Sequence, residues 1–143
     1  MEVDTKPFSK ALSIKYPGEE NVEFFFHKIE FEDKMIINIQ IDGSMDMTFD
    51  IADTFRTSNP SFLRSSNEDG EHEIEPRVLL GNHKNIKLQI VASQIGKLAL
   101  NSSRPKSIIL SIGSRWFGDG ESVEKQDFDK LLFILDNVKD LLQ

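Results

Sequence analysis

The stretch from Phe24 to Ile51 constrains the fold of this chain more than any other. It holds three consecutive runs in which apolar and polar residues largely alternate, separated by two short polar turns, Glu32-Asp33-Lys34 and Asp42-Gly43. Alternation with a period of two, in residue types that favour extended backbone, is typical of strands that bury one face. The simplest arrangement is therefore an antiparallel meander of three strands.

The lengths of the two turns predict which side chains share a face, because directly paired residues lie on the same side of a sheet. A three-residue turn at Ile41-Asp42-Gly43, with Gly43 in the left-handed conformation, keeps acidic residues off the apolar face. The same reasoning at the first turn pairs Phe31 with Met35. The predicted core face then consists of Phe25, Ile29, Phe31, Met35, Ile37, Ile39, Met45, Met47 and Phe49.

The opposite face of this predicted sheet is polar except at three positions. Phe24, Phe26 and Ile36 place large apolar side chains there. Either another segment of the same chain or a partner protein covers them, since sizeable exposed apolar patches mark interaction surfaces. Both alternatives stay open, and the three residues are candidate partner contacts.

The rest of the chain adds further strands and two helices. Phe8–Tyr16 is predicted to be an edge strand, and Val78–Leu80 and Ser107–Ser114 are short apolar runs typical of strands. Asn85–Leu100 and Phe128–Leu142 repeat apolar residues at helical spacing. This order predicts an α+β fold, a mostly antiparallel sheet of about six strands with two helices packed on it. The first helix is a candidate crossover between parallel strands.

Size and composition exclude several classes of protein. A chain of 143 residues is expected to form a single domain, with a flexible acidic loop at about 64–75. The net charge of −7 opposes binding to nucleic acid and to anionic membranes. No secretory signal is recognisable, and the absence of cysteine excludes disulfides and thiolate sites. We expect a cytoplasmic protein that is also present in the nucleus.

The sequence carries no recognisable pattern of catalytic or cofactor-binding residues. His27 falls on the predicted apolar face, where a histidine is usually a core residue, and no fixed spacing links it to His72 or His83. A nucleophile elbow, a glycine-rich phosphate loop and a calcium loop are also missing. We therefore expect no enzymatic activity, no catalytic residue, no metal and no cofactor.

One further segment, Arg115-Trp116-Phe117, follows the strand Ser107–Ser114 and precedes a Gly-Asp-Gly turn. Trp and Arg are the residue types most enriched at the energetic centres of protein interfaces. The three residues are therefore candidate partner contacts. The alternative is that Trp116 caps the core beneath the last helix.

Three segments together carry a family resemblance. They are Phe25–Phe49, Arg77–Gly113 with its RVLLG start and SIILSIG end, and the closing helix FDKLLFILDNVKDLL at Phe128–Leu142. Their order and sequence resemble the family of proteasome assembly chaperones three and four, closest to the fungal chaperone-4 type. The resemblance covers most of the chain outside residues 52–75.

The resemblance implies an assembly chaperone without enzymatic activity. Such a protein pairs with a related sister chaperone as a heterodimer and binds an α-type subunit of the 20S proteasome, with alpha-5 the expected one, to promote correct assembly of the α-ring. It implies no nucleotide, metal or cofactor. The alternative function is a small adaptor subunit of a trafficking or signalling complex, which would also act by protein–protein binding.

Overall fold

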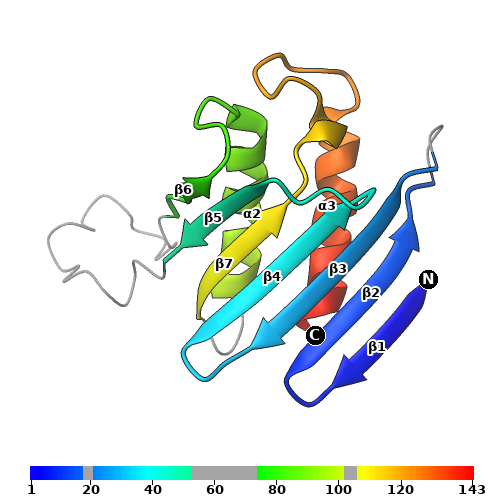
Figure 1. Ribbon diagram of the computed structural model, residues 1–143, viewed down its shortest axis with the longest axis vertical. Coiled ribbons are helices and arrows are strands. Elements are labelled where there is room, and N and C mark those ends of the chain that lie inside the picture. Colours follow the sequence, from blue (N-terminus) through cyan, green and yellow to red (C-terminus); the bar gives the residue numbers. More distant parts are fainter. Residues whose placement is uncertain (18–20, 53–73, 102–105) are drawn as a thin grey trace, which may run out of the picture.

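The computed structural model describes residues 1–17, 21–52, 74–101 and 106–143. In these ranges the chain forms one sheet of seven strands, with two long helices on the same side of it (Figure 1). The strands are β1 (Glu2–Lys6), β2 (Ser9–Lys15), β3 (Glu23–Glu30), β4 (Lys34–Ile41), β5 (Met47–Ile51), β6 (Arg77–Leu80) and β7 (Ser107–Ile112). The helices are α2 (Ile86–Leu100), the short 3-10 helix η1 (Arg115–Phe117) and α3 (Asp127–Leu142). The predicted α+β class is confirmed, with seven strands instead of about six.

The strands follow one another in the sheet in the order β1-β2-β3-β4-β7-β5-β6. All neighbours run antiparallel except β4 and β7, which run parallel. The predicted N-terminal strand is β2, but β1 forms the edge of the sheet beside it. Helix α2 connects β6 and β7. These two strands run parallel to each other, as predicted for a crossover, although β5 lies between them.

The predicted meander is wrong at its third strand, because β5 pairs with β7 and β6 and not with β4. Asp42 (φ 50°) and Gly43 (φ 78°) both adopt left-handed conformations, and Ile41 and Ser44 exchange both backbone hydrogen bonds at 3.0 Å. This is a two-residue hairpin turn and not the predicted three-residue one. Beyond the single bridge at Ser44 the chain leaves β4 and crosses the end of β7.

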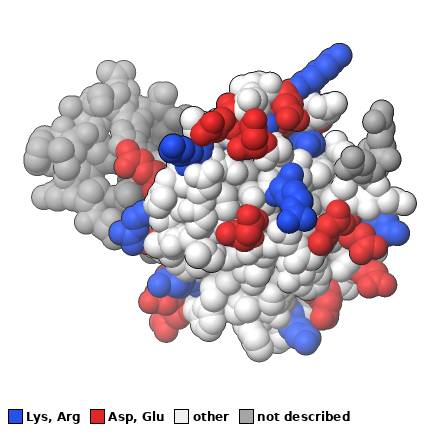
Figure 2. Space-filling view, turned by 45° about the horizontal axis from the view of Figure 1, so that its top comes forward, with Lys and Arg blue, Asp and Glu red and all other residues white. Residues whose placement is uncertain are grey.

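Two contacts hold the chain where it crosses the end of β7. A Cβ atom on Gly113 would lie 2.5 Å from the Ser44 carbonyl oxygen, so only glycine fits beneath the crossing chain. The Asp46 carboxylate accepts hydrogen bonds from the Ser114 backbone N–H at 2.8 Å and from the Ser114 hydroxyl at 2.6 Å. The crossing therefore fixes the start of η1. The connection from η1 to α3 lies at this same end (Figure 1), and Asp and Glu side chains gather at the top of the view in Figure 2.

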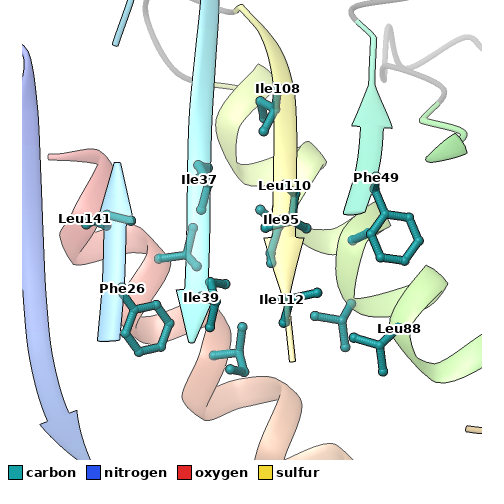
Figure 3. Packing of buried hydrophobic residues seen from close by; sticks show 14 of the residues in the cluster. Phe26, Ile37, Ile39, Phe49, Leu88, Ile95, Ile108, Leu110, Ile112 and Leu141 are labelled. Carbon is teal, nitrogen blue, oxygen red and sulfur yellow. The ribbon is translucent and has the colours of Figure 1, made fainter. Parts of the chain in front are cut away.

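The hydrophobic core lies between the sheet and the two helices (Figure 3). Ile37 and Ile39 of β4 and Leu110 of β7 are fully buried, and they pack against Leu88 and Ile95 of α2 in the same cluster. Alternation along β4 and β5 places every second residue in this core, as predicted for Met35, Ile37, Ile39, Met47 and Phe49. Met45, which was also predicted for the core, is 37% exposed.

The predicted register of β3 is wrong by one residue. The Phe31 N–H donates to the Lys34 carbonyl at 2.8 Å, so the turn between β3 and β4 contains only Glu32 and Asp33. An even turn reverses the predicted assignment of side chains to the two faces. Cross-strand pairing accordingly joins Phe26 with Ile39, on the side of the sheet that faces the helices.

The corrected register exchanges the two sets of β3 side chains. Phe24 and Phe26, predicted for the opposite face, are only 2% and 0% exposed. Phe25 and Phe31, predicted for the core, are 37% and 51% exposed. His27 likewise lies on the face away from the helices and not in the core. The predicted single domain stays a prediction, and most of the predicted loop at 64–75 lies outside the described residues.

We expect the Asp46→Asn change to weaken the crossing. Partial burial raises the pKa of the Asp46 carboxyl, but the hydrogen bonds from Ser114 outweigh this and hold the pKa below its usual value. Because the pKa of this carboxyl is lower in the folded state, its ionised form stabilises the fold at pH values above the unfolded-state pKa of about 3.9. This contribution disappears as the pH falls through the folded-state pKa. The variant weakens the hydrogen bonds to Ser114 and should therefore lower the free energy of unfolding at pH 7. The loss should be only about 1 kcal/mol, because solvent screens the exposed carboxylate.

Urea denaturation between about pH 5 and pH 2 tests this expectation, since the difference between variant and wild type should shrink across that range. The control is Asp33→Asn in the exposed β3–β4 turn. A deficit at Asp46→Asn that is independent of pH would contradict the assigned role of the carboxylate.

Candidate protein-binding surfaces

The side of the sheet away from the helices is left uncovered by every described segment. Cross-strand pairing places Ile29, Ile36 and Ile109 side by side on β3, β4 and β7. All three side chains are only half-buried. We call this surface the open face and define it by Phe25, His27, Ile29, Ile36, Asn38, Gln40, Thr48, Ile109 and Ser111.

A shallow depression of about 550 Å³ runs along β2 on the same side of the sheet. Its floor consists of the small residues Ser9, Ala11 and Ser13. One wall is formed by Phe25 and His27, whose rings stack at a centroid distance of 5.8 Å. Strand β1, with its charged residues, forms the other wall. Such a depression can receive large side chains from a packed partner.

Charged groups lie at the margins of this side of the sheet. The Asp50 carboxylate accepts a hydrogen bond from Arg77 at 3.0 Å where β5 meets the edge strand β6. At the other edge, β1 carries Glu2, Asp4 and Lys6. Between these margins the open face carries apolar and uncharged polar groups, including the Thr48 hydroxyl, which lies 3.0 Å from the Ser111 hydroxyl. An apolar centre with a charged rim is the usual anatomy of a protein interface.

A second surface is a groove of about 640 Å³ at the end of the sheet where η1 meets the β4–β5 turn. We call it the Trp116 groove. Its apolar lining comes from Tyr16, Val22, Ile41 and Trp116. Its charged lining comes from Asp42, Arg115, Glu124 and Lys130.

Trp116 joins the groove to the core beneath it. Its ring packs edge-to-face on three others, with distances between ring centroids of 4.7 Å to Phe24, 5.1 Å to Tyr16 and 5.1 Å to Phe117. The Lys130 ammonium donates to the Trp116 carbonyl oxygen at 2.6 Å and lies 5.1 Å above the indole ring. Trp116 therefore caps the core, as the alternative interpretation stated, and remains half-exposed to the groove.

The structure separates the six predicted partner contacts. Phe24, Phe26 and Phe117 are buried within the chain, so of the two alternatives stated for Phe24 and Phe26 the one that holds is cover by another segment of the same chain. Ile36 alone of the predicted patch lies on the open face. Arg115 and Trp116 line the groove, away from Ile36.

Sequence reasoning missed Phe25, Ile29 and Ile109 as residues of the open face. The run Phe24-Phe25-Phe26 is apolar in either register, so alternation could not decide which of its members faces the helices. The charge of Lys28 favoured the wrong register, because this residue is buried on the helix side, where its ammonium lies 2.8 Å from the Glu30 carboxylate. That hydrogen bond lowers the pKa of Glu30, against the opposing effect of burial.

Among the described residues, no three His, Cys, Asp or Glu side chains converge into a potential metal site. Buried charges instead connect elements of the fold. The Lys87 ammonium lies 3.2 Å from the Asp127 carboxylate and donates to the Phe117 carbonyl oxygen at 2.8 Å, which joins α2, α3 and η1. In the part of the chain that the structure describes, no helix is long and apolar enough to cross a membrane.

An uncovered sheet face and a groove lined by Trp and Tyr define a domain suited to binding other proteins. The chain belongs to the family of 20S proteasome chaperone assembly proteins 3 and 4, whose model matches residues 1–139. This is a family of assembly chaperones and not of enzymes, as predicted. The resemblance inferred from the sequence is thereby confirmed.

The fold is similar to that of a solved chain from yeast, described as part of a novel chaperone complex for yeast 20S proteasome assembly. The two share 22% sequence identity with a TM-score of 0.73, over 94% of this chain and 98% of the yeast chain. At this identity the similarity shows the fold alone. No curated protein matches the sequence.

The corrected faces of the sheet predict different costs for two truncations. Phe26→Ala removes a fully buried ring and should lower the free energy of unfolding by about 3–5 kcal/mol. Ile36→Ala, on the half-buried open face, should cost about 1 kcal/mol in the isolated chain. Urea denaturation measures both. Equal losses would contradict the assignment of the two residues to opposite sides of the sheet.

Proposed function

We propose that this chain assists assembly of the 20S proteasome as one half of a heterodimeric chaperone. It pairs with a related sister chaperone through the open face. As that pair it binds an α-type proteasome subunit, with alpha-5 the expected one, and promotes correct order in the α-ring. The observation that supports pairing most strongly is the uncovered row of Ile29, Ile36 and Ile109.

Burial of this row would stabilise a dimer. Covering apolar surface contributes about 25 cal/mol per Å², and three half-buried isoleucines side by side on β3, β4 and β7 supply such surface. A sister of the same fold offers a sheet of its own, and two sheets pack face to face about 10 Å apart. The depression along β2 gives the partner's large side chains a place to insert.

Charge favours a different partner over a second copy. Each chain carries a net charge of −7, so two copies repel one another at long range. A sister with a less negative or positive surface removes this penalty and associates faster. This supports a heterodimer, as the resemblance implied.

The mechanism needs only binding. A chaperone that occupies one surface of a proteasome subunit excludes wrong neighbours from that surface until the correct neighbour displaces it. No bond is made or broken, which agrees with a family of assembly chaperones. The location in cytoplasm and nucleus stays a prediction.

Affinity purification from cell extract tests this function against the alternative. The tagged chain should recover a related family member and an α-type proteasome subunit, identified by mass spectrometry. Recovery of vesicle or signalling components without proteasome subunits would overturn the proposal in favour of an adaptor.

Ile36→Glu should disrupt pairing while leaving the fold intact. A carboxylate at the centre of the apolar row would be desolvated by the partner, so affinity for the co-expressed sister should fall by about tenfold or more. The matched control is Ile90→Glu, at a 50% exposed position on α2, the other side of the sheet. Circular dichroism confirms folding of both variants, and size-exclusion chromatography with light scattering measures pairing. Equal pairing of both variants would contradict the assignment of the open face.

A further inference from the structure

We propose that the Trp116 groove holds the proteasome subunit, by receiving a segment in which a large apolar side chain stands beside a single carboxylate. This inference rests on the proposed function, and it places the second partner on a surface separate from the one that binds the sister.

The groove and the open face lie on different sides of the sheet. Ile41, which lines the groove, pairs with Phe24 on the side that faces the helices, whereas its neighbour Gln40 points to the open face. Arg115 and Trp116 of η1 and Lys130 of α3 line the groove from the same side as the helices. A sister packed on the open face therefore leaves the groove accessible.

The groove is built for an apolar side chain. Tyr16 and Trp116 are rigid aromatic walls. Trp116 makes edge-to-face contacts with Phe24 and Phe133, and Tyr16 makes an edge-to-face contact with Phe133 and a tilted one with Phe24. Lys130 further fixes the backbone at Trp116 through its 2.6 Å hydrogen bond. Walls that are already ordered lose little conformational entropy when a partner binds, and Trp, Tyr and Arg are the residue types enriched at interface centres.

The charges of the groove specify the second part of the ligand. The two acids and two bases of its lining sum to zero, so a strongly charged segment is disfavoured. Lys130 is engaged with the Trp116 carbonyl, and the Asp42 carboxylate accepts the Glu23 N–H at 2.9 Å. Arg115 is exposed, and among the described residues its guanidinium has neither a hydrogen-bond nor an ion-pair partner. A guanidinium binds a carboxylate through two parallel hydrogen bonds.

The acidic rim limits how many carboxylates the partner can bring. Asp119, Glu121 and Glu124 lie on the connection between η1 and α3, and Gly118 and Glu124 of this connection line the groove. A run of acids would be repelled there, whereas a single carboxylate directed at Arg115 is not. The ligand is therefore an aromatic or aliphatic anchor with one adjacent Asp or Glu.

The test uses the complex of this chain with its co-expressed sister, and measures its affinity for purified α-type subunits by biolayer interferometry. Arg115→Glu should weaken binding by about tenfold or more, and Arg115→Lys, which keeps the charge but loses the paired hydrogen bonds, should fall between it and wild type. The matched control is Lys139→Glu near the far end of α3, which changes the net charge equally and should bind like wild type.

Each outcome points to a different conclusion. If the wild-type pair binds the α-type subunit and the Arg115→Glu and Lys139→Glu pairs bind it with equal affinity, the groove is not the subunit site, whereas the proposed function stands. Loss of sister pairing in Arg115→Glu would assign the groove to the sister and also overturn the inference. If the wild-type pair binds no α-type subunit, the proposed function itself fails.

A photo-crosslinker gives an independent readout. We expect p-benzoylphenylalanine in place of Gln126, which lines the groove, to crosslink to the proteasome subunit. The same amino acid in place of Gln40 on the open face should crosslink to the sister. Crosslinks from position 126 to the sister alone would contradict the inference.

Discussion

The parallel pairing of β7 with β4 is the interaction on which the rest of the structure depends. It places the apolar residues Ile108, Leu110 and Ile112, all fully buried, in the middle of the sheet. Because β7 occupies this position, the chain after β4 has to cross its end to reach β5. The crossing explains the glycine at position 113 and the hydrogen bonds between Asp46 and Ser114. It also directs η1 over the core, so the Trp116 groove is a consequence of the sheet order.

In a sheet that carries helices on just one side, each strand residue faces either the core or a surface that a partner can cover. In β3 the even-numbered aromatic residues, Phe24 and Phe26, join the core, and Phe25 and His27 face outward. Large apolar residues therefore occur on both sides of the same strand. The inward set stabilises the isolated domain, and the outward set is available to stabilise a complex. This division suits a chaperone of the family to which the chain belongs, since such a protein acts by binding.

The long, periodic elements could be predicted from sequence because their patterns are unambiguous. Both helices, the strands β4 and β7, and the α+β class follow from periodicity and apolar runs. The register of β3 could not be predicted, because it depends on whether one turn contains two residues or three, and three consecutive phenylalanines satisfy either case. The insertion of β7 beside β4 is a long-range pairing that local patterns do not encode. Phe24 and Phe26 were assigned to the wrong face for the same reason, and only Ile36 lies on the face predicted for it.

The central claim is that the open face is the surface covered by a sister chaperone. Hydroxyl-radical footprinting of side chains, on the chain alone and in the co-purified pair, tests it most directly. We expect Phe25 and Ile36 to lose reactivity in the pair, while Val123, which is 91% exposed on the η1–α3 connection, keeps its reactivity. Unchanged reactivity of Phe25, together with protection of Ile90 and Phe128 on the helices, would place the partner on the other side of the molecule and contradict the account.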